Sequence, residues 1–219
     1  MRVRCRGEAF AALYANAKCF APTATVNKLM SKVILGTTMS LDGFINDRTG
    51  SVEALYPDLT ALDETPMMQE SIKNTGAVVM GRHAYDMANG DFTGYEYQVP
   101  IFVVTHHPPS DGTKGANDNL RVTFVTDGVE SAVRQAKAAA GNKEVNIIGT
   151  RSMVQQLLNT GLVNELHIGI MPVLLGQGLS FFQNLDAAHI ALEKIRIVET
   201  GERTDILYHV KKKKEQQTK

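Results

Sequence analysis

The stretch Ala77-Val78-Val79-Met80-Gly81-Arg82-His83 decides the fold class of this chain. Its apolar run is typical of a strand buried on both faces, and its glycine leads directly into a helical segment from about Arg82 to Ala88. A buried strand that turns straight into a helix is the unit from which parallel sheets are built. The turn also points backbone N–H groups outward beside the positive end of the helix dipole. These residues predict an α/β fold with a turn that is suited to binding an anion.

A second junction of this kind lies at Ile147-Ile148-Gly149-Thr150-Arg151-Ser152, where another buried strand passes through a glycine into a helix. Gly81 has no Cβ to block a phosphate, and Arg82 can hold one with two hydrogen bonds. For the first junction alone, a plain turn with a solvated arginine explains the residues equally well. Ligands of open α/β sheets bind at the carboxyl ends of strands, so two such junctions favour a dinucleotide.

Outward from these junctions, strand-like and helical segments alternate from Lys32 onward, and the last strands follow one another. This order predicts a mostly parallel sheet with an antiparallel C-terminal edge. Asp58 is the expected N-cap of a helix over Leu59–Lys73, and Pro66 interrupts this pattern, so the helix either begins at Pro66 or is kinked there. The predicted strands cover 33–38, 77–80, 101–105, 121–125, 145–148, 165–174, 190–198 and 205–210, and the further helices cover 131–140 and 153–158.

The composition describes an ordinary soluble globule of 219 residues, with 43% hydrophobic and 21% charged residues. Lys plus Arg and Asp plus Glu both number 23, so no overall field draws the chain to nucleic acid or to an anionic membrane. Both cysteines, Cys5 and Cys19, precede the body of the chain, which therefore has no internal disulfide or thiolate metal site. His106-His107 is a lone pair, more typical of a loop than of a metal site. We expect a cytoplasmic protein without a bound metal.

The two ends of the chain differ from its body. Residues 1–30 begin with alternating arginines and an Ala-rich stretch, which suits a leader or an upstream extension that precedes a natural start at Met30. Residues 212–219 form a basic, polar tail, for which solvation is a more common role than contact with an acidic partner. One domain is therefore expected over residues 31–211.

Four motifs resemble one known family: Ser40-Leu41-Asp42-Gly43-Phe44-Ile45, Val79-Met80-Gly81-Arg82, Gly161-Leu162-Val163-Asn164-Glu165-Leu166 and Pro172-Val173-Leu174-Leu175-Gly176. The family is the reductase domain of the bifunctional riboflavin-biosynthesis deaminase-reductase, in the superfamily that includes dihydrofolate reductase. The resemblance covers about residues 31–211. It implies a dihydrofolate-reductase-like, three-layer αβα sandwich around a mostly parallel, eight-stranded sheet, with NADPH as cofactor.

The resemblance also implies which residues bind the cofactor. Residues of the two junctions would hold phosphates, the threonine pair would flank the nicotinamide, and Thr105 with His106 would face the 2′-phosphate. The crowded second junction and Ala84, in place of the family's usual hydroxyl, depart from the pattern. The implied cofactor-binding residues are Thr37, Thr38, Gly81, Arg82, His83, Thr105, His106, Gly149, Thr150, Arg151 and Ser152.

Asp42 is the candidate catalytic residue, because hydride transfer to a C=N or C=O bond also needs a proton and a carboxyl group can help to deliver it. Asp42-Gly43 is also a favoured turn dipeptide, and a turn role explains it as well. Dihydrofolate reductases instead supply a carboxylate from the helix after the first strand, where this chain has three acids. These are Asp58, Asp63 and Glu64.

Other residues carry weaker signals. Glu165 opens a strand and is interpreted as structural. Aromatic side chains could line a pterin-sized slot, although a place in the core is the more common role for them: Phe44, Tyr85 and Phe182. Gly176-Gln177-Gly178 matches only part of a dinucleotide fingerprint and predicts no Rossmann fold.

The resemblance implies an NADPH-dependent reductase acting on a pteridine- or pyrimidine-like heterocycle. The expected activity is nearest to 5-amino-6-(5-phosphoribosylamino)uracil reductase. Dihydrofolate reduction and a non-catalytic role in nucleotide binding or protein interaction remain alternatives. The long strand over 165–174 and a free sheet edge favour a homodimer, and no nucleic acid or membrane partner is expected.

Overall fold

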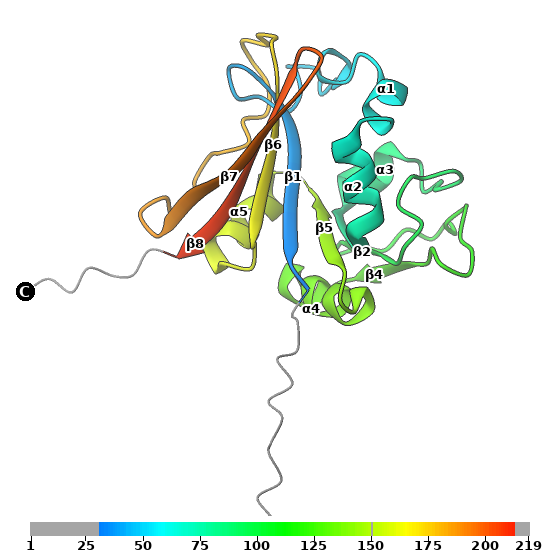
Figure 1. Cartoon of the computed structure of the whole chain (residues 1–219). Coiled ribbons are helices and arrows are strands. Elements are labelled where there is room, and N and C mark those ends of the chain that lie inside the picture. Colours follow the sequence, from blue (N-terminus) through cyan, green and yellow to red (C-terminus); the bar gives the residue numbers. More distant parts are fainter. Residues whose placement is uncertain (1–30, 150, 213–219) are drawn as a thin grey trace, which may run out of the picture.

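An eight-stranded sheet forms the centre of the described part of the chain, with the strand order β4-β3-β2-β5-β1-β6-β8-β7 (Figure 1). The structure is a computed structural model that describes residues 31–149 and 151–212, without the side chain of Arg151. The strands are β1 (Val33–Ser40), β2 (Thr75–Gly81), β3 (Ile101–Val104), β4 (Val122–Val125), β5 (Glu144–Ile148), β6 (Glu165–Met171), β7 (Ile190–Thr200) and β8 (Arg203–Lys212). The helices are η1 (Glu53–Leu55), α1 (Leu59–Asp63), α2 (Pro66–Asn74), α3 (Arg82–Met87), α4 (Val129–Ala140) and α5 (Arg151–Thr160).

The strand directions confirm the predicted fold class. β1 lies between β5 and β6 and is parallel to both, and β2, β3 and β4 continue the parallel sheet. β8 is antiparallel to β6, and β7 is antiparallel to β8, so the C-terminal hairpin forms the antiparallel edge. Its turn contains Gly201, whose φ of 58° an L-residue rarely adopts.

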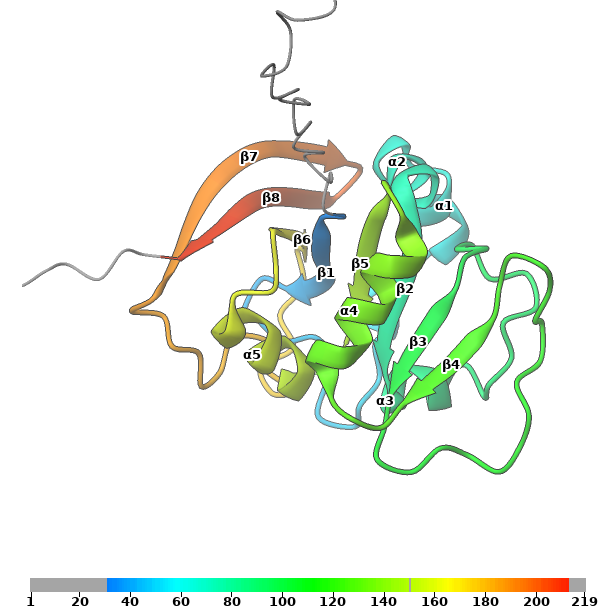
Figure 2. The same cartoon turned by 90° about the horizontal axis from the view of Figure 1, so that it is seen from below.

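The helices form layers on both faces of the sheet. α4 and α5 pack on one face, over a core that includes Val33, Leu35 and Ile147. On the other face, Met68 and Ile72 of α2 and Tyr85 of α3 pack against a second core around Val78. β7 and β8 curve away from α5 toward α2, as the view from below shows (Figure 2).

Local sequence signals fix most helix boundaries. The side chain of Asp58 caps α1 as predicted, by accepting a hydrogen bond of 2.9 Å from the Ala61 N–H. The helix predicted over Leu59–Lys73 is broken into α1 and α2, and Pro66 starts the second helix with Thr65 as its N-cap. β6 ends at Met171 rather than at the predicted Leu174, because Pro172 has no N–H for the ladder.

The outermost strands of this sheet are β4 and β7, and these are its free edges. β6 is an inner strand, with β1 on one side and β8 on the other. The homodimer stays a prediction. The strand that offers an exposed apolar surface to a partner is β7 rather than β6, because Leu192, Ile195 and Ile197 of β7 are exposed. The leader and the end of the tail lie outside the described residues. No helix within 31–149 or 151–212 is long and apolar enough to cross a bilayer.

Candidate active site

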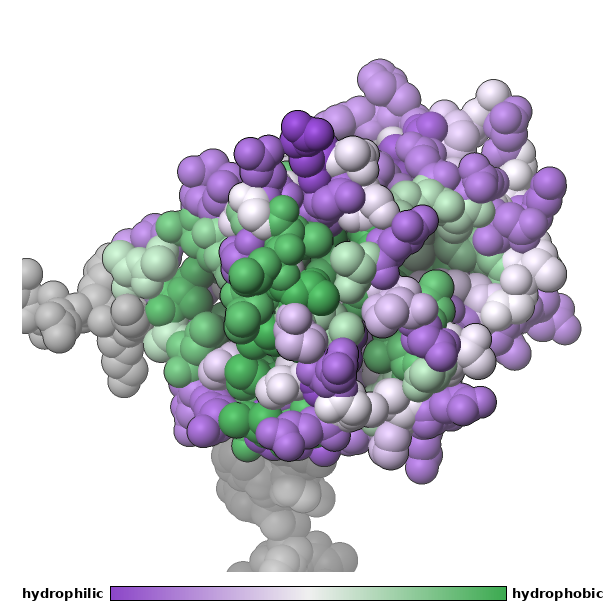
Figure 3. Space-filling model, turned by 90° about the horizontal axis from the view of Figure 1, so that it is seen from above, coloured by the Kyte–Doolittle hydropathy of each residue, from purple (hydrophilic) through white to green (hydrophobic). Residues whose placement is uncertain are grey.

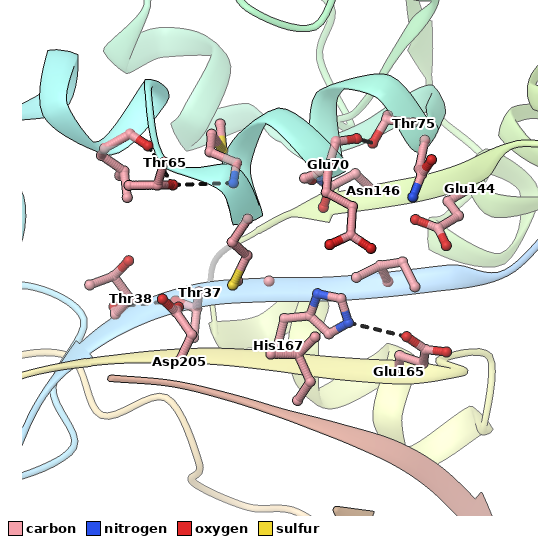
Figure 4. Close-up of a pocket in the computed structure, with 18 of the residues that line it drawn as sticks. Thr37, Thr38, Thr65, Glu70, Thr75, Glu144, Asn146, Glu165, His167 and Asp205 are labelled. Atoms are coloured by element: carbon pink, nitrogen blue, oxygen red, sulfur yellow. Dashed lines mark hydrogen bonds and ion pairs between the residues drawn. The ribbon is translucent and has the colours of Figure 1, made fainter. Parts of the chain in front are cut away.

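Alternation along β1 separates a core face from a cavity face. Val33 and Leu35 point into the core beneath α4 and α5, whereas Ile34, Gly36 and Thr38 line a cavity on the opposite face. The neighbouring strands repeat this pattern, so the cavity face also carries polar side chains such as Asn146 and His167 (Figure 4). This half of the sheet therefore presents polar groups where a buried sheet would normally pack.

The cavity has a volume of about 640 Å³ and lies between α1 and α2 on one side and β1, β5, β6 and β8 on the other. Glu70 of α2 and His167 of β6 extend toward one another across it (Figure 4). An ion pair of 2.6 Å between Arg196 Nη2 of β7 and Glu70 Oε2 joins the curved hairpin to α2. A cavity of this size accommodates a small organic ligand.

A buried ion pair lies toward the carboxyl end of the strands. Arg203 Nε and Nη2 donate to the carboxylate of Asp205 at 2.8–2.9 Å, and Arg203 Nη1 donates to Thr38 Oγ1 at 2.7 Å. Gly169 provides the space for the guanidinium, because a Cβ at this position would collide with it. Thr38 is thus held in a fixed orientation beside the cavity.

A second charged cluster lies at the amino end of the strands. Glu165 accepts a hydrogen bond from Lys32 Nζ at 2.9 Å, and its other oxygen lies 3.2 Å from His167 Nε2. Burial lowers the pKa of His167 below its usual value, although Glu165 opposes this shift, so the ring is neutral at neutral pH. Burial raises the pKa of Glu144, and the charge of Glu165 adds to this shift.

The helical side of the cavity carries a pair of acids. Asp63, the last residue of α1, and Glu96 both line the cavity. Burial raises the pKa of Glu96, and the negative charge of Asp63 raises it further. Beside them, the Tyr97 hydroxyl lies 3.0 Å from Ser71 Oγ and accepts a hydrogen bond of 2.9 Å from Asn146 Nδ2. The carboxyl group of Glu96 therefore keeps its proton to a higher pH than an ordinary glutamate.

The structure separates the three acids that the sequence left open. Asp58 uses its carboxylate to cap α1, and Glu64 is exposed outside the cavity lining. Of these three acids, only Asp63 lines the cavity of about 640 Å³. The break between α1 and α2 produces this arrangement, because it ends the first helix at Asp63.

The predicted cofactor residues lie toward the carboxyl ends of adjacent parallel strands. We call this border of the sheet the cofactor edge. Thr105 follows β3, Gly81 ends β2, Gly149 follows β5, and the threonine pair lies on β1. Thr37 and Thr38 also line the cavity, so this edge and the cavity are continuous. The cofactor role of all these residues stays a prediction.

The predicted cofactor residues differ in their hydrogen-bond partners and in their exposure. Arg82 Nε donates to Asp86 Oδ1 at 2.7 Å, and Arg82 Nη1 donates to the His107 carbonyl at 2.6 Å. The hydroxyl of Thr105 is buried in a local turn with His107. The exposed residues of the set are His83, His106 and Ser152. Thr150 and the side chain of Arg151 lie outside the described residues.

Asp42 lies in the turn after β1 and is not part of the cavity lining. Its carboxylate accepts hydrogen bonds from Ser40 Oγ at 2.6 Å and from the N–H groups of Leu175 and Gly176 at 3.2 and 2.7 Å. The Ser40 bond and then these backbone bonds hold the pKa of Asp42 below its ordinary value. The catalytic role of Asp42 stays a prediction, and its contacts favour the turn interpretation.

The loop after β6 explains the glycine pattern at 176–178. Gly178 lies so close to the Asn46 carbonyl that an added Cβ would collide with it, and Leu179 N–H donates to Asn46 Oδ1 at 2.9 Å.

The view onto the carboxyl ends of the strands shows hydrophobic residues gathered on this face (Figure 3). The loops after β1 and β6 carry exposed apolar side chains: Leu41, Leu174 and Phe182.

Sequence patterns did not single out the Arg203–Asp205 pair, and they favoured a structural role for Glu165. Glu165 does form ion pairs, but it also lines the cavity together with His167. The available signal was alternation, because Glu165 and His167 on one strand and Arg203 and Asp205 on another place charged groups two residues apart. Phe44, Tyr85 and Phe182 do not line the larger cavity, and Tyr85 is buried in the second core.

Solved structures with the same fold identify the class of protein. A putative riboflavin biosynthesis protein from Shewanella sp. PV-4 is 24% identical and has a TM-score of 0.67, with 82% of this chain and 99% of that chain covered. Dihydrofolate reductase from Enterococcus faecalis, complexed with NADP(H), is 16% identical and has a TM-score of 0.54, with coverages of 84% and 97%. The chain thus has a dihydrofolate-reductase-like fold.

A match to a family model identifies the family within this fold class. Residues 31–206 match the model of the RibD C-terminal domain, and the chain belongs to this family. A diaminohydroxyphosphoribosylaminopyrimidine deaminase/5-amino-6-(5-phosphoribosylamino)uracil reductase from Thermotoga maritima is 15% identical, with a TM-score of 0.65. The match covers 84% of this chain and 58% of that protein. The resemblance seen in the sequence is therefore confirmed.

Proposed function

We propose that this chain is an NADPH-dependent reductase that acts on a pteridine- or pyrimidine-like heterocycle bound in the cavity beside α2. The observation that carries the proposal is the continuity of two sites. Thr37 and Thr38 line the cavity and also belong to the sheet edge on which the predicted cofactor residues lie. A substrate in the cavity and a cofactor at that edge would meet at these threonines.

The residues of the cofactor edge fit a phosphate-bearing group in part. Gly81 caps α3 without a side-chain hydrogen bond, so the first-turn N–H groups are not used by a cap, and Arg82 is partly exposed at the same turn. Gly81, Arg82, His83 and Ser152 would hold the phosphates, and His106 rather than the buried Thr105 would face the 2′-phosphate. When bound, NADPH supplies a hydride.

The acids of the cavity provide hydrogen-bond acceptors and a proton. Asp63 offers a carboxylate to the N–H groups of an aminopyrimidine or pterin edge. Glu96, whose pKa is raised by burial and by Asp63, can keep a proton available near the reacting atoms. The Arg203–Asp205 pair holds Thr38 in place, and the Tyr97 hydroxyl holds Asn146 on the same sheet wall of the cavity.

Dihydrofolate reduction is the second candidate, and the position of Asp63 favours it. Asp63 comes from the helical segment after the first strand and lines the cavity, as the alternative interpretation of the sequence required. The two functions differ in substrate, and the same site geometry supports both.

Oxidation of NADPH, followed by absorbance against a panel with dihydrofolate and the aminouracil compound, tests the proposal. Turnover of either compound supports a reductase and distinguishes the two candidates. Absence of turnover together with absence of NADPH binding in calorimetry would overturn the proposal.

Arg82→Ala tests the cofactor edge. The change should weaken NADPH binding by about 1.5–3 kcal/mol, the range for a hydrogen bond to a charged group. Calorimetry measures the dissociation constant, and NADH serves as the matched ligand without the 2′-phosphate. We expect NADPH to bind more tightly than NADH, and an unchanged constant in the variant would remove Arg82 from the site.

A further inference from the structure

The cavity contains more acidic than basic side chains. Three basic residues line it, namely Lys32, Arg196 and Arg203. Six carboxylates line the same space. They are Asp63, Glu70, Glu96, Glu144, Glu165 and Asp205.

Each of the three basic side chains is already paired with a carboxylate. Lys32 Nζ lies 2.9 Å from Glu165, Arg196 Nη2 lies 2.6 Å from Glu70, and Arg203 Nη2 lies 2.8 Å from Asp205. These pairs neutralise one another at close range. Within the described residues, the lining therefore offers a ligand no lysine or arginine that is free of a carboxylate.

Three carboxylates remain outside these pairs: Asp63, Glu96 and Glu144. No ion pair joins any of them to a basic side chain within the described part of the chain. Burial raises the pKa of Glu96 and Glu144; Asp63 adds to the shift of Glu96, and for Glu144 the charges of Glu165 and Glu70 raise the pKa whereas Lys32 lowers it. The two histidines of the lining do not reverse the excess of acidic groups, because His167 is neutral at neutral pH and His209 lies 3.5 Å from Glu165.

Phosphate groups are bound elsewhere in proteins by arginine, by lysine and by exposed N–H groups at helix starts. In this chain the uncapped first-turn N–H groups of α3 lie at the cofactor edge, beside the partly exposed Arg82, which is itself paired with Asp86 at 2.7 Å, and Gly81 and Arg82 are not part of the cavity lining. A phosphate on a ligand inside the cavity would instead lie among carboxylates, without a free cation.

We propose that the cavity selects an unphosphorylated heterocycle whose substituent is neutral or cationic, with hydroxyl or amino groups, and excludes the phosphorylated form. The inference rests on the proposed function, because it takes the cavity as the substrate site. It assigns Glu144 the part of a specificity determinant at the amino end of the strands. Hydroxyl or amino groups of the substituent can donate to Glu144 and to the amide oxygen of Asn146.

A matched pair of ligands tests the inference on the full chain. The pair is 5-amino-6-(5-phosphoribosylamino)uracil and the same compound without its phosphate, each titrated by calorimetry and then assayed for NADPH oxidation. We expect the unphosphorylated compound to bind at least about tenfold more tightly, and the preference should weaken with salt because like-charge repulsion is screened. Equal or tighter binding of the phosphorylated compound would overturn the inference.

Glu144→Gln shows whether charge is the cause. The variant should improve binding of the phosphorylated compound relative to its partner by about tenfold, as expected for one charge about 10 Å away in an effective dielectric near 20. Glu130→Gln is the matched control, because Glu130 is an exposed acid of α4 on the opposite face of the sheet. An equal change in both variants would show that Glu144 does not set the preference.

The two proposals fail in different ways. NADPH binding and oxidation with a preference for the phosphorylated compound would leave the reductase in place and remove the inference. Binding of the unphosphorylated compound without NADPH binding would support the inference and remove the reductase. Absence of binding by both compounds would overturn this substrate class, and NADPH titration of the same sample would still report on the cofactor edge.

Discussion

The face of the sheet that carries α2 is packed in one half and hollow in the other. Around β2, the buried side chains of Val78 and Met80 meet a cluster of aromatic rings that includes Phe92 and Tyr97. Around β1, the same face carries Gly36 and Thr38 and borders a cavity of about 640 Å³. Since protein interiors are normally filled to crystal-like density, an open polar space of this size favours the proposed ligand site over a packing fault. The comparison separates residues that hold the fold from residues that serve the site.

Phe92→Ala should produce the largest effect, on stability alone. The Phe92 ring is buried, with its centroid 5.9 Å from that of Tyr85 and 5.4 Å from that of Tyr95. Loss of the ring should lower the free energy of unfolding by about 3–5 kcal/mol, which denaturant titration measures. Met87→Ala, at an exposed position, is the control and should change it by less than about 0.5 kcal/mol. A small loss for Phe92→Ala would mean that the packed half collapses to fill the space.

Asp63→Asn should produce the corresponding effect in the hollow half, on turnover alone. The change removes the acceptor for the N–H groups of the heterocycle and also the charge that helps to raise the pKa of Glu96, so turnover should fall at least about a hundredfold, within the roughly 10²–10⁴ that proton delivery contributes to a rate. Stability should stay within about 0.5 kcal/mol of the original, and steady-state kinetics with a denaturant titration measures both.

Asp58→Asn is the matched control for this prediction. Asn is as good an N-cap as Asp, so the variant should keep both α1 and activity. Near-normal turnover of Asp63→Asn would show that the reaction uses neither the Asp63 carboxylate nor its effect on Glu96, and Asp42 would be the next candidate for proton delivery. In that case Asp42→Asn should reduce turnover while NADPH affinity is kept.

The helices and strands themselves were more predictable from sequence than the cavity, because they depend on local periodicity. The apolar runs of β2 and β5 and the glycine at the end of α4 determine their own elements, and the structure confirms all three. Pro66 likewise predicted the start of α2. These signals act within a few residues of one another.

The hollow half depends on contacts between distant segments, which periodicity does not reveal. Arg203 reaches Thr38 only because Gly169 pairs with Asp205 across β6 and β8 and leaves space for the guanidinium. The choice of Asp63 over Asp58 depends on where α1 ends. Both features follow from tertiary structure, and so the sequence pointed to the sheet edge but not to the cavity lining.

A pair of glycine variants compares the two environments with one added methyl group. A Cβ at Gly76 would lie 2.8 Å from the Ala140 carbonyl oxygen and 2.9 Å from Ala140 Cα, so Gly76→Ala should cost about 1–3 kcal/mol of stability. A Cβ at Gly36 would meet only Asn146 Oδ1, at 3.9 Å, so Gly36→Ala should keep or raise stability, by up to about 1 kcal/mol. It should raise the KM of the substrate, since the methyl group enters the cavity. Equal melting losses for both variants would contradict the distinction between the packed and the hollow half.

The smallest effect is expected at Gly43, in the turn that borders the hollow half. Gly43 has a φ of 87°, and an added Cβ would meet no atom within 4 Å, so any loss comes from backbone conformation alone. An L-residue in this region costs about 1–2 kcal/mol, of which the reduced entropy of the unfolded chain returns about 0.4–1 kcal/mol. Gly43→Ala should therefore lower the free energy of unfolding by up to about 1.5 kcal/mol in a thermal or denaturant titration. Gly43→Asn is the control and should lose less, because Asn adopts positive φ more readily. If both variants lose the same amount, the loss does not come from the positive φ of Gly43, and the hydrogen bonds between Asp42 and the loop at 175–176 are the next candidate for its origin.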